Sequence, residues 1–148
     1  LKDHASRETC VNFYVSQVDA INNWDLVDLS CYKILGHWLF DKDKQLLYDW
    51  AKENHLWKQR IATISCMHFV KQGEFKDALA IADLLQHHPH DLIHKAVGWI
   101  LREIGKEDEQ LLIDYLTPRY KEMPRTMLRY AIERFEEGKR KAFLNSMI

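Results

Sequence analysis

The chain has 148 residues, 47% of them hydrophobic and 11% aromatic, which is enough to bury the core of one domain. We expect neither a membrane span nor a signal peptide, because no apolar run is long enough to cross a bilayer and the first residues are polar and charged. The net charge of −1 argues against a general nucleic-acid binder, but residues 118–148 contain eight Lys and Arg against four Asp and Glu, so a localised anionic partner fits the sequence.

Apolar residues follow helical spacing along nearly the whole chain, which contains only five Gly and three Pro and no convincing alternating stretch. The predicted helices span, in chain order, about 11–21, 24–39, 44–53, 57–72, 75–85, 91–105, 107–120 and 124–135, with a short helix after Gly138. Gly73 ends the fourth of these helices, Asp91 can cap the sixth, and Pro124 fits the first turn of the eighth. The sequence therefore predicts an all-α fold.

The longer predicted helices begin at a regular interval. Their starts lie near Trp24, Trp57, Asp91 and Pro124, which are 33, 34 and 33 residues apart. A helical hairpin that repeats with this period is typical of an α-solenoid, in which each repeat packs on its neighbours. We therefore expect residues 1–148 to form a single solenoid domain.

Charged residues recur at one register of this repeat. Steps of 32, 35 and 34 residues connect one carboxylate and three cations, namely Asp28, Arg60, Lys95 and Arg129. Because equivalent positions of a solenoid stack along one surface, we expect these side chains to form a polar line. Cations on a curved surface suit the phosphates of a nucleic-acid backbone, and a carboxylate among them suits a positively charged substrate.

Two tryptophans share a helix face with these charges. Trp24 and Asp28 are four residues apart, so the indole lies next to the carboxylate on one face. Lys95, Trp99 and Arg102 also fall on one face, away from the apolar stripe of their helix. The alternative is that these are ordinary solvated faces with an aromatic residue for packing. Indoles that flank a cationic substrate, or stack on sugars and bases, would give them a function instead.

Four segments resemble the motifs of a known family, in its order and at its approximate spacing. They are Asn-Asn-Trp-Asp-Leu-Val-Asp at 22–28, Leu-Trp-Lys-Gln-Arg-Ile-Ala at 56–62, Lys-Ala-Val-Gly-Trp-Ile-Leu-Arg-Glu at 95–103 and Met-Pro-Arg-Thr-Met-Leu-Arg-Tyr-Ala-Ile-Glu at 123–133. With them the chain is similar, over essentially its whole length, to the DNA alkylation repair family of AlkD-like DNA glycosylases. The resemblance implies a right-handed α-solenoid of HEAT-like helical hairpin repeats. It also implies that further N-terminal helices of the family domain are absent from this chain.

The resemblance implies a monofunctional DNA glycosylase that excises cationic N3- or N7-alkylated purines, such as 3-methyladenine and 7-methylguanine, from duplex DNA in base excision repair. Asp28 would match the catalytic carboxylate, which stabilises the positive charge developing on the sugar and can position water. Trp24 and Trp99 would match the tryptophans that pack against the lesion's deoxyribose, and Arg60 the arginine near its backbone. The residues expected to bind DNA are Lys95, Arg102, Arg125 and Arg129. The Asp28 motif contains no lysine that could form a Schiff base, so strand cleavage is not expected.

The expected partner is double-stranded DNA with alkylated bases. We expect a monomer with no cofactor, no metal and no membrane association. Cys10, Cys31 and Cys66 are odd in number and lack metal-ligand spacing, which indicates reduced thiols in a cytoplasmic protein. Such a protein would associate with the nucleoid when it is bound to DNA.

Three other interpretations remain open. The chain can be a DNA-structure-binding solenoid without catalysis, although a pure phosphate binder gains nothing from Asp28. It can be a protein-interaction scaffold, a common role of α-solenoids. It can also contain a metal site, since His90 and His94 are one helical turn apart. The ligands of that site would come from His87, His88, His90, Asp91 and His94, although a histidine-rich loop before a capped helix is usually solvated.

Overall fold

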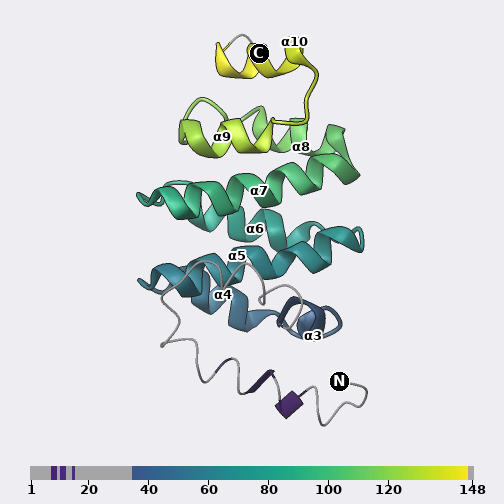
Figure 1. The fold of residues 1–148 in the computed structure, drawn as a ribbon, viewed down its shortest axis with the longest axis vertical. Coiled ribbons are helices and arrows are strands. Elements are labelled where there is room, and N and C mark those ends of the chain that lie inside the picture. The colour runs from purple at the N-terminus through teal and green to yellow at the C-terminus, as the bar shows by residue number, and fades with distance from the viewer. Residues whose placement is uncertain (1–7, 10, 13–14, 16–34, 147–148) are drawn as a thin grey trace.

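A computed structural model of the protein describes residues 8–9, 11–12, 15 and 35–146. Its helices are α3 (His37–Leu39), α4 (Gln45–Lys52), α5 (Leu56–Lys71), α6 (Lys76–Leu85), α7 (Asp91–Glu107), α8 (Glu109–Leu116), α9 (Arg125–Ala131) and α10 (Glu137–Leu144). They are stacked one above another along the long axis of the molecule (Figure 1). The described residues contain no strand, so the predicted all-α solenoid is confirmed, while its right-handed winding stays a prediction.

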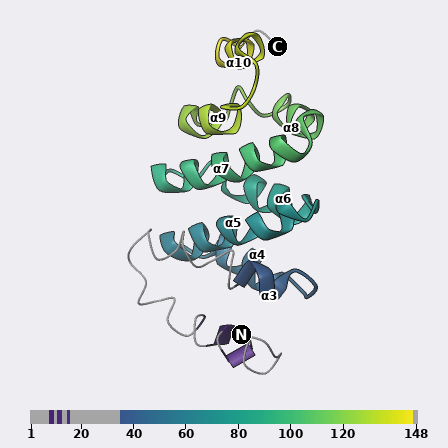
Figure 2. The same ribbon diagram turned by 45° about the vertical axis from the view of Figure 1, so that its right-hand side comes forward.

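The helices form two rows that pack against each other. The first row consists of α5, α7 and α9, with α7 packed between the other two, and the second row consists of α4, α6 and α8 (Figure 2). In the second row α4 lies against α5, α6 lies against both α5 and α7, and α8 lies against α7. Each helix therefore contacts mainly its neighbours in the adjoining repeats, as a solenoid requires.

The core lies between the two rows. α5 is buried around nearly its whole circumference, since every residue from Gln59 to Met67 is buried. α7 is amphipathic, with a buried stripe that includes Ile93, Val97 and Ile104. A helix that is covered on all sides belongs at the centre of a domain, so α5 gives the first row a rigid base. None of the helices in the described ranges is both long enough and apolar enough to cross a bilayer.

The boundaries of α7 differ from the predicted ones. His90 caps this helix in place of Asp91, and its Nδ1 accepts a hydrogen bond from the Leu92 N–H at 3.1 Å. The reason is that His90 has an extended backbone, whereas Asp91 already lies in the first helical turn. The helix also continues through Gly105 to Glu107, so the end predicted at Gly105 is wrong.

α8 and α9 are shorter than predicted. Asp108 caps α8 by accepting a hydrogen bond from the Leu111 N–H at 3.1 Å. Pro124 is the capping residue of α9, which ends at Ala131, although Phe135 beyond it is still buried. Apolar periodicity marks buried positions whether or not the backbone stays helical, and it therefore overestimates these lengths. The helices predicted before residue 35 lie outside the described residues.

Polar side chains join successive helices of the second row. The Tyr48 hydroxyl donates to Asp77 Oδ1 at 2.6 Å, which links α4 to α6, and the Tyr115 hydroxyl donates to Asp83 Oδ1 at 2.9 Å, which links α8 to α6. Burial and the hydrogen bond to aspartate raise the pKa of both tyrosines. Arg119 Nε also donates to Asp83 Oδ1 at 2.9 Å, and its guanidinium lies 4.1 Å from the centre of the Tyr115 ring. We call these contacts the second-row clasps.

Candidate functional site

A pocket of about 390 Å³ lies across the three helices of the first row. Arg60 of α5 and Tyr130 of α9 line two of its sides. The residues of α7 that line it are Leu92, Lys95, Trp99 and Arg102. Four of the eight site residues predicted from the sequence are therefore brought together here: Arg60, Lys95, Trp99 and Arg102. The pocket combines three cationic side chains with an indole.

Arg60 forms the α5 wall of the pocket and is almost fully buried, with 6% of its surface exposed. Its Nη1 donates a hydrogen bond to the backbone carbonyl of Leu92 at 2.5 Å, which ties α5 to the first turn of α7. An arginine keeps its charge even when it is buried. This wall of the pocket is therefore positively charged, and the position of the charge is fixed by packing.

Lys95 is a more exposed cation of the pocket. Its Nζ lies 3.1 Å from Asp91 Oδ2, one helical turn earlier, and the two side chains are 41% and 57% exposed. An ion pair this open to water contributes between zero and about 1 kcal/mol. Lys95 can therefore exchange Asp91 for a phosphate at little cost.

Trp99 is half-buried, and its indole is held by Glu103. The indole Nε1 donates to Glu103 Oε1 at 3.3 Å. The same carboxylate lies 3.1 Å from Lys106 Nζ and 3.9 Å from Arg102 Nη2, and its side chain is only 15% exposed. Glu103 therefore orients the indole and the neighbouring guanidinium together.

Arg102 connects α7 to the segment after α9. Its Nη1 forms an ion pair with Glu133, whose side chain is 57% exposed. Its Nε is buried and has no hydrogen-bond partner within the described part of the chain. A guanidinium offers five N–H donors in a planar fork, which matches the oxygens of a phosphate. Arg102 thus retains capacity to bind an anion next to the pocket.

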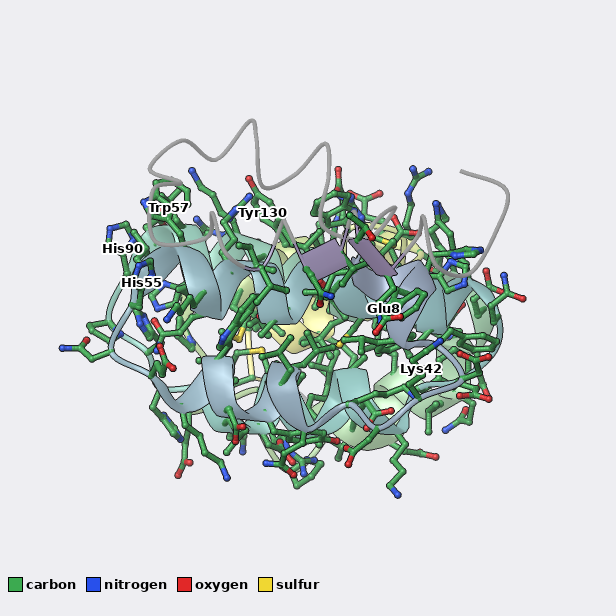
Figure 3. All side chains as sticks on the ribbon, turned by 90° about the horizontal axis from the view of Figure 1, so that it is seen from below. Glu8, Lys42, His55, Trp57, His90 and Tyr130 are labelled. Atoms are coloured by element: carbon green, nitrogen blue, oxygen red, sulfur yellow. The ribbon has the colours of Figure 1, made fainter. Side chains whose placement is uncertain are left out.

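Tyr130 was not predicted as a site residue, although it lines the pocket. In Figure 3, which looks along the stack, it lies on the same side of the molecule as Trp57 at the start of α5. One signal for it existed in the sequence. The step of 35 residues from Arg60 to Lys95, taken once more, ends at Tyr130.

Arg125 and Arg129 do not line this pocket. Arg129 is exposed on α9. Arg125 is also exposed, and its Nη1 donates to the Leu144 carbonyl at 2.7 Å, which ties the start of α9 to the end of α10. Their predicted contacts with DNA stay predictions.

Asp28 and Trp24 lie outside the described residues. Their predicted positions beside the cations of the first row therefore stay predictions, as do the roles assigned to them.

Within the described ranges, which include the histidine-rich segment 87–94, no three His, Cys, Asp or Glu side chains are grouped so that they could hold a metal ion. The histidines of this segment bond to the protein instead. His88 Nε2 lies 2.9 Å from Gln59 Oε1, and its Nδ1 accepts from the His90 N–H at 3.0 Å. Burial lowers the pKa of His88, and nearby His90 and His94 lower it further, which favours the neutral ring that these bonds require. The loop therefore positions the start of α7 against α5.

Comparison with known protein families gives a match. The model of a family described as DNA alkylation repair enzyme matches residues 1–135, which is most of the 148-residue chain. No curated protein matches the chain.

Proposed function

The chain belongs to the DNA alkylation repair enzyme family, and on this premise we propose that it is a monofunctional DNA glycosylase. Its substrates would be cationic N3- or N7-alkylated purines, such as 3-methyladenine and 7-methylguanine, in duplex DNA. Family membership supports a role in DNA repair. The more specific proposal is supported by the pocket that joins three cations to an indole. We further propose that the protein acts as a cytoplasmic monomer without a cofactor.

The first row would bind the DNA backbone at the lesion. Arg60 and Arg102 offer planar N–H forks and Lys95 a point charge, so the three would hold phosphate oxygens on both sides of the damaged nucleotide. The Trp99 indole would pack against the deoxyribose between them. An apolar ring against the sugar excludes water, and electrostatic interactions are stronger where water is excluded.

The reaction would be hydrolysis of the bond between C1′ of the sugar and N9 of the purine. Alkylation at N3 or N7 gives the purine a positive charge, so it leaves as a neutral base with the bonding electron pair. Positive charge then develops on the sugar, where the Asp28 carboxylate would stabilise it and orient the attacking water. Water adds to C1′ and releases one proton. Trp24, four residues before Asp28 in the sequence, would pack against the same sugar.

The decisive experiment is an excision assay of the full chain on duplex DNA that contains N7-methylguanine. We expect release of 7-methylguanine without strand cleavage. Asp28→Asn keeps the shape of the side chain and removes its charge, so release should slow on the order of a hundredfold, the scale seen when one preorganised electrostatic group is lost.

Asp25→Asn is the matched control, because Asp25 belongs to the same motif but does not have the four-residue spacing from Trp24 that Asp28 has. It should leave the rate within a few-fold of wild type. Unchanged release by Asp28→Asn would refute the role of this carboxylate, and absence of release by the wild-type chain would refute the glycosylase proposal.

A second candidate function is DNA-structure binding without catalysis. The pocket favours it in one respect, since its three cations and its indole would bind a DNA backbone whether or not a carboxylate stands beside them. Salt-dependent binding to duplex DNA together with no excision of any alkylated purine would identify the protein as such a binder.

A further inference from the structure

Gly98 of α7 allows α9 to approach unusually closely beside the pocket. A Cβ at this position would lie 2.5 Å from the Tyr130 Cβ and 2.7 Å from the Met127 carbonyl oxygen, both too short for real contacts. Only glycine fits there without moving α9. The close approach places Tyr130 next to the turn of α7 that carries Trp99, and so Tyr130 completes the α9 wall of the pocket.

The hydroxyl of Tyr130 differs from those of the second-row clasps. The Tyr48 and Tyr115 hydroxyls donate to Asp77 and Asp83. Tyr130 is only partly buried, and its hydroxyl makes no hydrogen bond within the ranges that the structure describes. A donor that lines a cavity and is not already bonded can donate to a ligand.

The other polar groups of the pocket determine what that ligand is. Arg60, Lys95 and Arg102 are all positively charged, so an anion is attracted to the space that Tyr130 also lines. A phosphate oxygen is a strong acceptor, and hydroxyl donors commonly reinforce cationic contacts to the DNA backbone. A phosphate has a full negative charge that a neutral base edge lacks, so the three surrounding cations favour the phosphate.

We propose that Tyr130 is a positioning residue for the DNA backbone, whose hydroxyl donates a hydrogen bond to a phosphate oxygen held by the pocket's cations. This inference rests on the proposed function and adds a phosphate contact to it. Gly98 sets the distance between α7 and α9 at which the hydroxyl reaches that phosphate. The hydrogen bond fixes the backbone, and thereby the sugar, against Trp99.

The test compares two tyrosine-to-phenylalanine variants of the full chain. Tyr130→Phe removes only the hydroxyl and should weaken binding to a lesion-containing duplex roughly tenfold, the value of a hydrogen bond to a charged group. Tyr115→Phe removes the hydroxyl of a second-row clasp and should leave DNA affinity unchanged. Both affinities are measured by fluorescence anisotropy, and thermal melting shows whether each variant is folded.

A scan with methylphosphonates identifies the phosphate itself. Each backbone position near the lesion is replaced in turn by an uncharged methylphosphonate that lacks one oxygen. At one position, the methylphosphonate should weaken binding by wild type roughly tenfold more than binding by Tyr130→Phe. The reason is that the variant already lacks the hydroxyl that contacts this phosphate. A purely structural role of Tyr130 would give the same loss in both proteins at every position, and that result would overturn the proposal.

The outcome separates this inference from the glycosylase proposal. If wild type does not excise a base but Tyr130→Phe still binds tenfold more weakly with the position-specific pattern, the phosphate contact stands and the glycosylase proposal fails. If wild type excises the base and Tyr130→Phe binds as wild type does, the glycosylase proposal stands and the inference fails.

Discussion

The two rows of helices use the same kinds of side chain in opposite ways. In the second row, Tyr115 and Arg119 both bond to the Asp83 carboxylate, and the arginine also covers the tyrosine ring. In the first row, Arg102 pairs with Glu133, which is 57% exposed, and a pocket opens beside it. Polar groups that satisfy one another hold successive helices together. Polar groups that line a cavity remain able to bind a ligand.

This difference shows why the number of charges does not identify a binding surface. Arg60, Lys95 and Arg102 each have a carboxylate or a carbonyl as a partner. The same is true of Arg119 and of the two tyrosines in the second-row clasps. The partners are similarly exposed in the two rows, since Asp83 is 48% and Glu133 is 57% exposed, and what marks the first row is the pocket that its cations line. An exposed ion pair contributes at most about 1 kcal/mol, so a phosphate can replace its carboxylate.

The largest expected effect comes from neutralising two cations of the first row. Lys95→Gln with Arg102→Gln keeps polar side chains and removes both charges, so affinity for duplex DNA should fall on the order of a hundredfold at low salt. The slope of log affinity against log salt should become shallower by roughly 2, about 0.9 for each lost phosphate contact. Anisotropy titrations over a series of salt concentrations measure both quantities.

The matched control neutralises two cations that pair with carboxylates of the second row. Arg119→Gln with Lys139→Gln removes partners of Asp83 and Glu109, which belong to α6 and α8. We expect the salt slope of this variant to equal that of wild type. Equal losses of slope in the two double variants would mean that the rows do not differ in function.

A smaller effect is expected from adding one methyl group to α7. A Cβ at Gly98 meets the backbone of α9, so Gly98→Ala should lower the free energy of unfolding by about 1–3 kcal/mol and also weaken DNA binding. Urea unfolding and anisotropy measure the two losses.

Gly105→Ala, also in α7, is the control for Gly98→Ala. A Cβ there meets the Cδ2 atom of Leu112 in α8 at 2.5 Å, which is the end of a side chain and can rotate away. Its unfolding free energy should change less than that of Gly98→Ala, and its DNA affinity should not change. A loss of DNA affinity in both variants would show that the pocket does not depend on the approach of α9.

The smallest effect is expected from Glu133. Glu133→Gln removes a negative charge that competes with phosphate for Arg102, so DNA affinity should rise by a few-fold, in keeping with an exposed ion pair. Glu137→Gln serves for comparison, because Glu137 pairs with Lys141 within α10 and should not affect binding. A weaker affinity for Glu133→Gln would mean that the carboxylate holds Arg102 in its binding position.

The repeat architecture and part of the pocket followed from the sequence. The 33- and 34-residue period predicts stacked hairpins, and stacking places Arg60 and Lys95 on one surface whatever the details of packing. Tyr130 was missed because a step of 34 residues ends at Arg129, and one residue turns a side chain by about 100° around a helix. Arg129 therefore lies exposed, while Tyr130 lines the pocket.

Contacts that depend on the distance between helices could not be predicted. Nothing in the spacing of Gly98 distinguishes it from Gly105, yet one faces the backbone of α9 and the other a side chain of α8. Trp99 and Glu103 are four residues apart, so their hydrogen bond could have been proposed from helical spacing. Arg102 and Glu133 are 31 residues apart, so their ion pair can be recognised only in the packed structure.

The pocket draws its walls from α5, α7 and α9, and this has a consequence for newly made protein. Tyr130 follows Arg60 by 70 residues, so a growing polypeptide exposes the earliest wall long before the last one is synthesised. Since domains tend to fold from the N-terminal end during translation, α4 to α7 can pack while the ribosome is still completing α9. Such an intermediate would have a packed hydrophobic core, but only the α5 and α7 walls of the pocket. Affinity for DNA would therefore appear abruptly, when α9 packs against α7.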